Sequence, residues 1–450
     1  GKSTMIKALT GVYKINAGSI MVDGKPQQFN GTLDAQNAGI ATVYQEVNLC
    51  TNLSVGENVM LGHEKRGPFG IDWKKTHEAA KKYLAQMGLE SIDPHTPLSS
   101  ISIAMQQLVA IARAMVINAK VLILDEPTSS LDTHEVQVLF RIIRQLKSKG
   151  ISVIFISHKL DEVLKISRRI TVLTKGRVTG QIDTKDADKS TIVRMMVGEE
   201  VTPPEFSKIR RDHKDMVPVL CARDLKAEDD RKVRTLNGVS LSVYPGEVVG
   251  IASVEGNGQV ELAEVLAGVR RACGGQVLID GAQVSTKNAK DFIDRGVSYV
   301  PADRNYVGSV PDFPLYENWI LRNRRPPKKG CFLDYRFIKT QAAKAMIDFD
   351  VRARGITDRS ANLSGGNLQK FILARALSKH PKAMICAYPT RGLDIKATWF
   401  IREKILKARE DGMGLLLLSG DFEELFALSD RIVVLYRGRI VGEVVPEKTT

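Results

Sequence analysis

Two groups of residues in the first half of the chain have the types and spacing that phosphate chemistry requires. The sequence opens with Gly1-Lys2-Ser3-Thr4 directly before an apolar helical pattern, so backbone N–H groups at a helix N-terminus would face bound phosphates. Lys2 would supply a point charge, and Ser3 would supply a hydroxyl ligand for Mg²⁺. Further on, the apolar run LILDEPT ends in two acids, which predicts Asp125 at the metal and Glu126 where it polarises an attacking water.

Two further polar residues follow apolar runs in the same half. Gln45 lies in TVYQEVNL, and we expect it to sense a γ-phosphate or to bind the metal together with Ser3 and Asp125. His158 lies at the end of IFISH, where an imidazole can hold that phosphate. Taken in order, these residues predict hydrolysis of a nucleoside triphosphate with Mg²⁺.

The elements that must position these residues occur twice. LTGVYKINAGSIMVDGK (9–25) aligns with LAGVRRACGGQVLIDGA (266–282), and SRRITVLTKGRVTGQI (167–182) aligns with SDRIVVLYRGRIVGEV (429–444). Such self-similarity indicates two homologous domains. We place them at 1–198 and 218–450, joined by a linker at 199–217 that is rich in charge and proline.

Within each copy, short apolar runs alternate with amphipathic stretches. VLILD and ISVIFISH are too short for helices and rich in branched residues, whereas THEVQVLFRIIRQLKSKG has helical periodicity. This alternation predicts α/β domains with a mainly parallel sheet.

A glycine pair distinguishes the second copy. LSGGN at 363–367 precedes the helical pattern LQKFILARALSK, so Ser364 would cap a helix while Gly365 and Gly366, followed by Asn367, let backbone approach a phosphate. The first copy has ISIAMQQ at the equivalent place. It retains Ser102 but replaces the glycines with larger residues.

The second copy has instead lost the residues expected to contact phosphate and metal. VEGNGQVEL retains Gly256 and Gly258, but Gln259 stands in place of the lysine and valine in place of the metal-binding hydroxyl. The remaining replacements are Ala302 for Gln45, Gly420 for His158, Ala387 for Asp125 and Tyr388 for Glu126. A site built on these residues would bind nucleotide weakly and would not hydrolyse it.

The order GKST, Gln45, signature, LILDEPT, SSLD and ISH resembles the nucleotide-binding cassette of ATP-binding-cassette (ABC) transporters, twice over. The resemblance implies two tandem P-loop NTPase domains, each with a helical signature subdomain, that bind ATP and Mg²⁺. It also implies crosswise pairing of cassettes. One working site would join Lys2, Ser3, Gln45, Asp125, Glu126 and His158 to Ser364–Asn367, and a degenerate site would join Gly256, Gly258 and Gln259 to Ser102.

The resemblance also bears on the transported substrate. The first half is similar to the ATPases of fructose and galactofuranose importers, whereas the sequence from about residue 133 is similar to nucleoside importers. Membership implies a subunit at the cytoplasmic face of the plasma membrane that drives uptake of a monosaccharide, or alternatively of a nucleoside. Its partners would be transmembrane permease subunits and, through them, a periplasmic or lipid-anchored binding protein.

Composition leaves a second class of function open. The net charge of +14 would suit twin-cassette ATPases that act on ribosomes or nucleic acid. Such proteins usually carry a long charged arm, and the linker here is short, so we expect no nucleic-acid partner. The basic stretch RNRRPPKKG (322–330) is either a solvated loop or a contact to anionic lipid or permease.

Other features concern compartment and completeness. Five scattered cysteines favour a reducing cytoplasm, and no apolar run is long enough to span a membrane. The phosphate loop lacks its first half, so we expect a longer parent protein. An alternative is that only the full-length protein is active.

Overall fold

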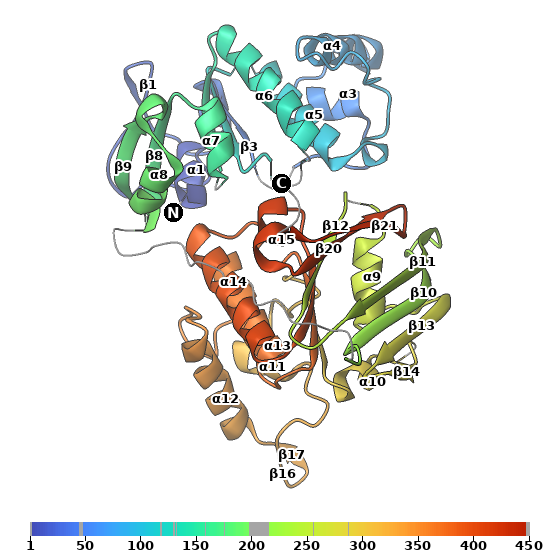
Figure 1. Cartoon of the computed structure of the whole chain (residues 1–450). Helices are drawn as coiled ribbons and strands as arrows, with labels where there is room; N and C mark the ends of the chain where they lie inside the picture. Colours follow the sequence, from blue (N-terminus) through green and yellow to red (C-terminus); the bar gives the residue numbers. More distant parts are fainter. Residues whose placement is uncertain are drawn as a thin grey trace. The chain divides into compact units, whose positions relative to one another are not determined.

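The computed structural model divides the chain into two compact units, Gly1–Val201 (unit one) and Thr202–Thr450 (unit two). It describes residues 2–44, 48–117, 119–128, 131, 133–157, 159–174, 176–197, 216–254, 256–286 and 288–446. Of the predicted linker, only residues 216 and 217 lie within this part of the chain. Figure 1 shows the elements of each unit.

Unit one is built around a small parallel sheet. Strands β3 (Ile40–Val43), β6 (Val121–Asp125) and β7 (Ser152–Ile156) pair in parallel, with β6 in the centre. Its helices are α1 (Lys2–Leu9), α2 (Thr32–Asn37), α3 (Val55–Met60), α4 (Trp73–Ala85), α5 (Ile103–Val116), α6 (Thr133–Ser148), α7 (Leu160–Ile166) and α8 (Lys189–Val197). Antiparallel hairpins are formed by β1 (Ile20–Val22) with β2 (Lys25–Gln27), β4 (Arg66–Gly67) with β5 (Gly70–Ile71), and β8 (Arg169–Thr174) with β9 (Arg177–Asp183).

Unit two repeats this order on a larger sheet. Five strands run parallel in the order β15 (Val297–Val300), β18 (Ala383–Ala387), β19 (Gly414–Leu418), β12 (Val248–Ala252) and β20 (Arg431–Tyr436), and β21 (Arg439–Val444) adds an antiparallel edge. A second, antiparallel sheet has the order β11 (Arg234–Val243), β10 (Leu220–Glu228), β13 (Gly274–Ile279) and β14 (Ala282–Val284). The remaining elements are α9 (Gln259–Leu266), α10 (Ala289–Asp294), α11 (Leu315–Ile320), α12 (Tyr335–Asp348), α13 (Gly365–Leu377), α14 (Ile395–Glu410), α15 (Phe422–Leu428), β16 (Lys328–Lys329) and β17 (Phe332–Leu333).

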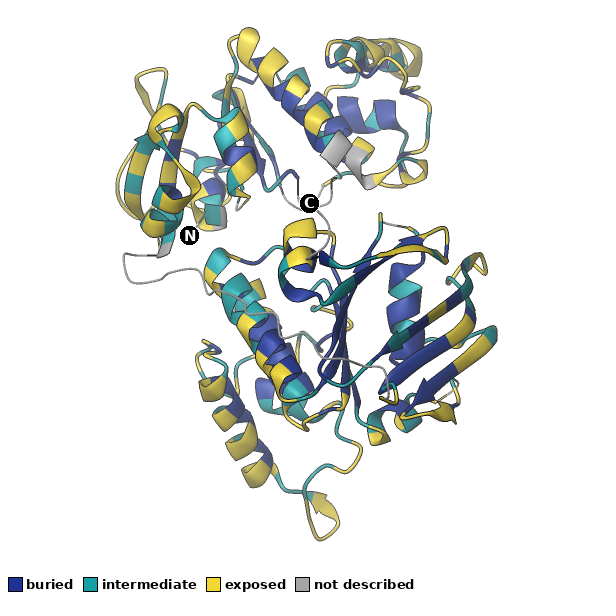
Figure 2. Ribbon diagram, viewed as in Figure 1, coloured by how far each residue is buried: buried dark blue, intermediate teal, exposed yellow. Residues whose placement is uncertain are grey.

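Burial on both faces explains why the central strands read as unbroken apolar runs. In β18, Ile385 faces a core shared with α9 and the antiparallel sheet, while its neighbours Met384 and Cys386 face a core shared with α13 and α14. In β6, Leu122 and Leu124 pack toward α5 and α6, and Ile123 packs toward α1. The buried strands are dark blue in Figure 2. The predicted α/β fold with mainly parallel sheets is therefore confirmed.

The basic stretch 322–330 has two distinct parts. Arg322 is largely buried, and its Nη1 donates to the carbonyl oxygen of Tyr299 at 2.9 Å. Lys328 and Lys329 are exposed in β16, on a short hairpin with β17. The start of this stretch is thus a structural anchor, because a buried guanidinium needs such an acceptor.

Candidate functional site

The phosphate loop of unit one faces the end of its central strand. Lys2 begins α1, and its Nζ lies 3.2 Å from Oε1 of Glu126. Thr4 is exposed on the same helix. Gly1, Gln45, His158 and the side chain of Ser3 lie outside the described part of the structure, so their predicted roles stay predictions.

The two acids occupy different environments at the end of β6. Asp125 is only 8% exposed, and its burial, reinforced by the neighbouring Glu126 charge and opposed by Lys2, raises the pKa of its carboxyl group. Glu126 adopts a left-handed backbone (φ 48°), and its N–H donates to the carbonyl oxygen of Ile156 at 2.9 Å. Since few non-glycine residues adopt this conformation, the fold holds the acid in one orientation at a local cost.

A magnesium ion fits this arrangement of acids. The described residues hold no cluster of three or more His, Cys, Asp or Glu side chains that could bind a metal by themselves. Mg²⁺ usually binds through one or two carboxylates together with substrate phosphates. Burial and the neighbouring Glu126 charge raise the pKa of the Asp125 carboxyl group, so its ionised form would be stabilised by a cation that arrives with the nucleotide.

A buried glutamate connects the two loops that carry the predicted catalytic residues. Oε2 of Glu162, on α7, accepts from Thr128 Oγ1 at 2.5 Å and from Ser157 Oγ at 3.4 Å. Its Oε1 lies 3.2 Å from Nζ of Lys159, which also donates to the carbonyl oxygen of Thr128 at 3.1 Å. Thr128 is two residues beyond Glu126, and Ser157 directly precedes residue 158. We call Thr128, Ser157 and Glu162 the unit-one clasp.

Unit two contains the same arrangement. Glu424, fully buried on α15, accepts from Thr390 Oγ1 and from Ser419 Oγ, both at 2.7 Å, and lies 3.3 Å from Nε of Arg402. We call Thr390, Ser419 and Glu424 the unit-two clasp. The sequence analysis missed both glutamates, although a buried acid on the apolar side of an amphipathic helix was a usable signal.

The signature of unit two caps helix α13. Oγ of Ser364 accepts from the N–H of Asn367 at 3.5 Å and from its Nδ2 at 2.9 Å. Gly365 begins the helix beside the guanidinium of Arg304. At Gly366 an added Cβ would lie 3.1 Å from Cβ of Ala397, so a larger residue there would require a small shift of α13 against α14. The predicted helix cap is present, whereas contact with phosphate stays a prediction.

The equivalent helix of unit one keeps the cap alone. Oγ of Ser102 accepts from the N–H of Met105 at 3.3 Å at the start of α5. The side chains of Ile103 and Ala104 lie outside the described part of the structure. A serine cap alone therefore does not separate the two signatures, and the difference predicted between them rests on the glycines.

An arginine on each signature helix reaches back to an earlier segment of its unit, between β3 and α3 in unit one and between β15 and the end of α11 in unit two. Arg375, buried on α13, donates to the carbonyl oxygens of Asn318 and Gly308, at 2.8 and 2.5 Å. Burial lowers the pKa of this guanidinium to about 10. In unit one, Arg113 donates in the same way to the carbonyl oxygen of Asn48, at 3.2 Å. These residues, which the sequence analysis did not single out, tie the signature helices to their neighbouring loops.

The phosphate loop of unit two retains its shape without its charges. Gly256 and Gly258 have positive φ angles (87° and 94°), and a Cβ at Gly258 would lie 2.5 Å from the carbonyl oxygen of Thr235. Gln259, in place of the lysine, donates through Nε2 to the hydroxyl oxygen of Tyr388 at 3.2 Å. A neutral hydrogen bond thus stands where unit one has the Lys2–Glu126 ion pair.

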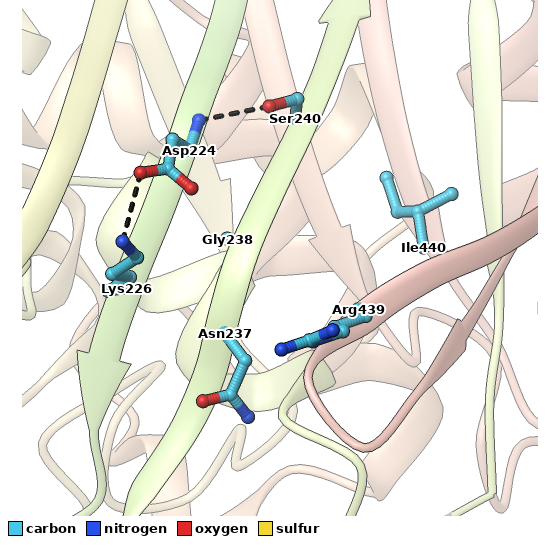
Figure 3. Close-up of a pocket in the computed structure, with 7 residues that line it drawn as sticks. All are labelled: Asp224, Lys226, Asn237, Gly238, Ser240, Arg439 and Ile440. Atoms are coloured by element: carbon cyan, nitrogen blue, oxygen red, sulfur yellow. Dashed lines mark hydrogen bonds and ion pairs between the residues drawn. The ribbon is translucent and has the colours of Figure 1, made fainter.

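A separate depression lies between the antiparallel sheet of unit two (β10 and β11) and the edge strand β21. It encloses about 600 Å³ and is lined by Asp224, Lys226, Asn237, Gly238, Ser240, Arg439 and Ile440 (Figure 3). Asp224 forms an ion pair with Lys226 at 3.0 Å, and its N–H donates to Ser240 Oγ at 2.9 Å. None of the predicted site residues lines it, and two of its charged residues, Asp224 and Lys226, already form an ion pair with each other.

A phosphate loop leading into a helix, opposite a buried strand that ends in acids, defines a nucleoside-triphosphate-binding domain. A family model described as "ABC transporter" matches residues 1–129 and 236–391. The chain belongs to the ABC transporter family: it is an ABC-type ATPase with two ATP-binding cassettes, as the sequence predicted. Among the described residues, no helix combines the length and apolar character needed to cross a membrane.

Relatives with assigned substrates match along the whole chain. A fructose import ATP-binding protein, FruK of Bifidobacterium longum, is 50% identical over 100% of this chain and 87% of its own length. A glucose import ATP-binding protein, TsgD13 of Haloferax volcanii, is 39% identical over 99% of this chain and 86% of its own. A guanosine import ATP-binding protein, NupO of Bacillus subtilis, is 36% identical over 100% of this chain and 88% of its own.

Proposed function

We propose that this chain is the ATP-hydrolysing subunit of a bacterial importer of the carbohydrate type, and that the imported substrate is a monosaccharide. The relatives include import proteins for fructose, glucose, xylose and ribose. Guanosine and nucleoside import proteins also match, at 36% and 34% identity, so a nucleoside is the second candidate. The 50% identity to the fructose import protein favours a monosaccharide.

The observation that carries the proposal is the chemical difference between two equivalent positions in the units. Lys2 and Glu126 face each other as an ion pair at 3.2 Å, whereas Gln259 and Tyr388 form a neutral hydrogen bond at the same length. Only the first pair can supply both a cation for phosphate and a base for water. Hydrolysis is therefore assigned to unit one.

The ion pair also suggests an order of events. Before nucleotide binds, Lys2 neutralises Glu126. Phosphate oxygens compete for the Lys2 ammonium group, which releases the Glu126 carboxylate to accept a proton from the attacking water. Asp125, with the Ser3 hydroxyl and Gln45, would hold Mg²⁺ against the phosphates, and His158 would contact the γ-phosphate.

The signature of unit two completes this site in the proposal. Ser364 through Asn367 form the start of a capped helix, which is suited to a phosphate approached from outside the unit. The partners would be transmembrane permease subunits, which place the chain at the cytoplasmic face of the plasma membrane, and a substrate-binding protein reached through the permease. No nucleic-acid partner is expected.

The test is ATP hydrolysis by the full-length protein reconstituted with its permease. Glu126→Gln and Ser364→Arg should each abolish turnover although they lie in different units, and Ser102→Arg, at the equivalent cap in unit one, should be mild. Equal damage from the two arginine substitutions would refute the crosswise pairing. Full activity without permease, stimulated by ribosomes or RNA, would favour the other class of twin-cassette ATPase.

A further inference from the structure

The phosphate loop of unit two is closed by its own side chains. Gln259 is 2% exposed at the start of α9, and both the oxygen and the nitrogen of its side-chain amide form hydrogen bonds. Oε1 accepts from the backbone N–H of Asn257 at 3.0 Å, and Nε2 donates to the hydroxyl oxygen of Tyr388 at 3.2 Å. A loop N–H of the kind that usually faces phosphate is therefore already bonded within the protein.

The other polar atoms of Asn257 fix the loop from its outer side. Nδ2 donates to the carbonyl oxygen of Val254 at 2.9 Å, and Oδ1 accepts from the N–H of Arg437 at 2.7 Å. The carbonyl oxygen of Asn257 accepts from the N–H of Gly438 at 3.0 Å. Each donor and acceptor of Asn257 has a partner, so this residue has no unpaired backbone N–H to offer to a phosphate.

Tyr388 is anchored on the opposite wall. Its N–H donates to the carbonyl oxygen of Leu418 at 2.8 Å, and its side chain packs against the core between the two sheets. The guanidinium of Arg391 lies 5.7 Å from the centre of its ring. The Tyr388 hydroxyl is thus presented to Gln259 by a fixed ring, in the same left-handed backbone conformation as Glu126.

From this geometry we infer that Gln259 and Tyr388 form a plug that replaces the phosphates of a nucleotide, so that the phosphate loop of unit two stays empty at ATP concentrations that saturate unit one and the chain then carries a single nucleotide. The inference goes beyond the proposed function, which assigns hydrolysis to unit one but leaves binding by unit two open. It is also independent of the crosswise pairing.

The two units differ in what a nucleotide would gain by opening the contact. In unit one, Lys2 exchanges a carboxylate for phosphates and keeps a charge-assisted contact. In unit two, a neutral amide would leave two satisfied hydrogen bonds for one weaker contact, and Val260 offers no hydroxyl to a metal ion. We expect the affinity of unit two for ATP to be at least roughly 100-fold below that of unit one.

Binding stoichiometry tests the plug without any substitution. The full-length protein should bind a single adenylyl imidodiphosphate per chain by equilibrium dialysis with Mg²⁺, and 8-azido-ATP should leave the 254–262 peptide of unit two unlabelled. Labelling of the 254–262 peptide with an affinity within tenfold of unit one would overturn the inference.

The hydrogen-exchange rate of the Asn257 amide, measured without nucleotide, tests whether the bond to Gln259 is formed. In Gln259→Ala, the Asn257 backbone amide should exchange at least about tenfold faster than in the unsubstituted protein. The control is Tyr436→Phe, at an exposed tyrosine on β20, which should leave the exchange rate of this amide unchanged. Gln259→Lys with Val260→Ser should gain labelling in unit two. An Asn257 amide that exchanges at the same rate in Gln259→Ala would refute the internal bond. These measurements do not depend on transport, so they can fail while the proposed function stands.

Discussion

Removing the charge of Glu162 should separate positioning from catalysis, because unit two supplies a matched control. Glu162→Gln keeps the shape of the side chain but removes its negative charge. This charge accepts hydrogen bonds from Thr128 Oγ1 and Ser157 Oγ and pairs with Lys159 Nζ. Glu424→Gln makes the same change in the unit-two clasp.

The expected cost follows from the contacts. A hydrogen bond to a charged group contributes about 1.5–3 kcal/mol, and the glutamine amide can replace part of this, so we expect a loss of about 2 kcal/mol in each unit. For a domain of about 200 residues this corresponds to a fall in Tm of about 4–8 °C. Turnover should respond differently in the two variants. A shift of about 1 Å at the loops carrying Glu126 and residue 158 costs up to about 100-fold in kcat, and unit two has no acid to misplace.

The assay combines calorimetry with steady-state ATP hydrolysis well below both unfolding transitions. Glu162→Gln should lower kcat at least about tenfold with little change in KM, while Glu424→Gln should lower Tm but change kcat less than about twofold. Equal losses of kcat in the two variants would show that the clasps act through overall stability, and the positioning role of Glu162 would be wrong.

Three further predictions concern the acids at the strand ends. Glu126→Gln should retain ATP binding and lower turnover by about 10³-fold or more in single-turnover assays, and near-normal turnover would exclude it as the base. Asp125→Asn should raise Tm at pH 7 in the absence of nucleotide, by about 2–4 °C for each kcal/mol added to the free energy of unfolding. Because the pKa of Asp125 is raised in the folded protein, its carboxyl group stabilises the fold below its ordinary pKa of 3.8, and this stabilisation is lost as pH rises through the pKa of the folded state. The increase in Tm caused by Asp125→Asn should therefore vanish in acid. An increase in Tm that does not depend on pH would show that the raised pKa is not its cause. Tyr388→Glu in a Glu126→Gln background should restore no turnover, since Gln259 and Ala387 remain, and any rescue would refute the assignment of hydrolysis to unit one alone.

The sequence predicted the fold because its central strands are buried on both faces. VLILD and its counterpart AMICA show continuous apolar runs, and the amphipathic stretch after each forms a helix, α6 or α14. Periodicity cannot reveal contacts between residues far apart in the chain. Gln259 and Tyr388 are 129 residues apart, and alignment of the two copies shows each as a loss, whereas the structure shows that they bond to each other.

The buried charges were hidden for a related reason. Glu162, Glu424 and Arg375 belong to residue types that usually lie at the surface, and only their partners show why they are inside. Arg375 is satisfied by backbone carbonyl oxygens, which leave no trace in the sequence at all. Such residues could be found only from the apolar positions that surround them on a helix.

Comparison of the two units separates what the fold requires from what hydrolysis requires. Unit two keeps the clasp, the serine-capped helix and the left-handed residue directly after the strand equivalent to β6, which is Tyr388 after β18. These features are therefore compatible with a unit that lacks the acids, whether or not unit one also uses them to position its predicted catalytic residues. At the phosphate loop and the strand end, unit two has neutral residues in place of the charged ones, and these two residues, Gln259 and Tyr388, are hydrogen-bonded to each other. The buried Gln259 amide and the Tyr388 hydroxyl satisfy each other at 3.2 Å, so the two replacements are compatible as a pair. Their pairing supports the inference that the phosphate loop of unit two is held closed by the protein itself, while the proposed hydrolysis takes place in unit one.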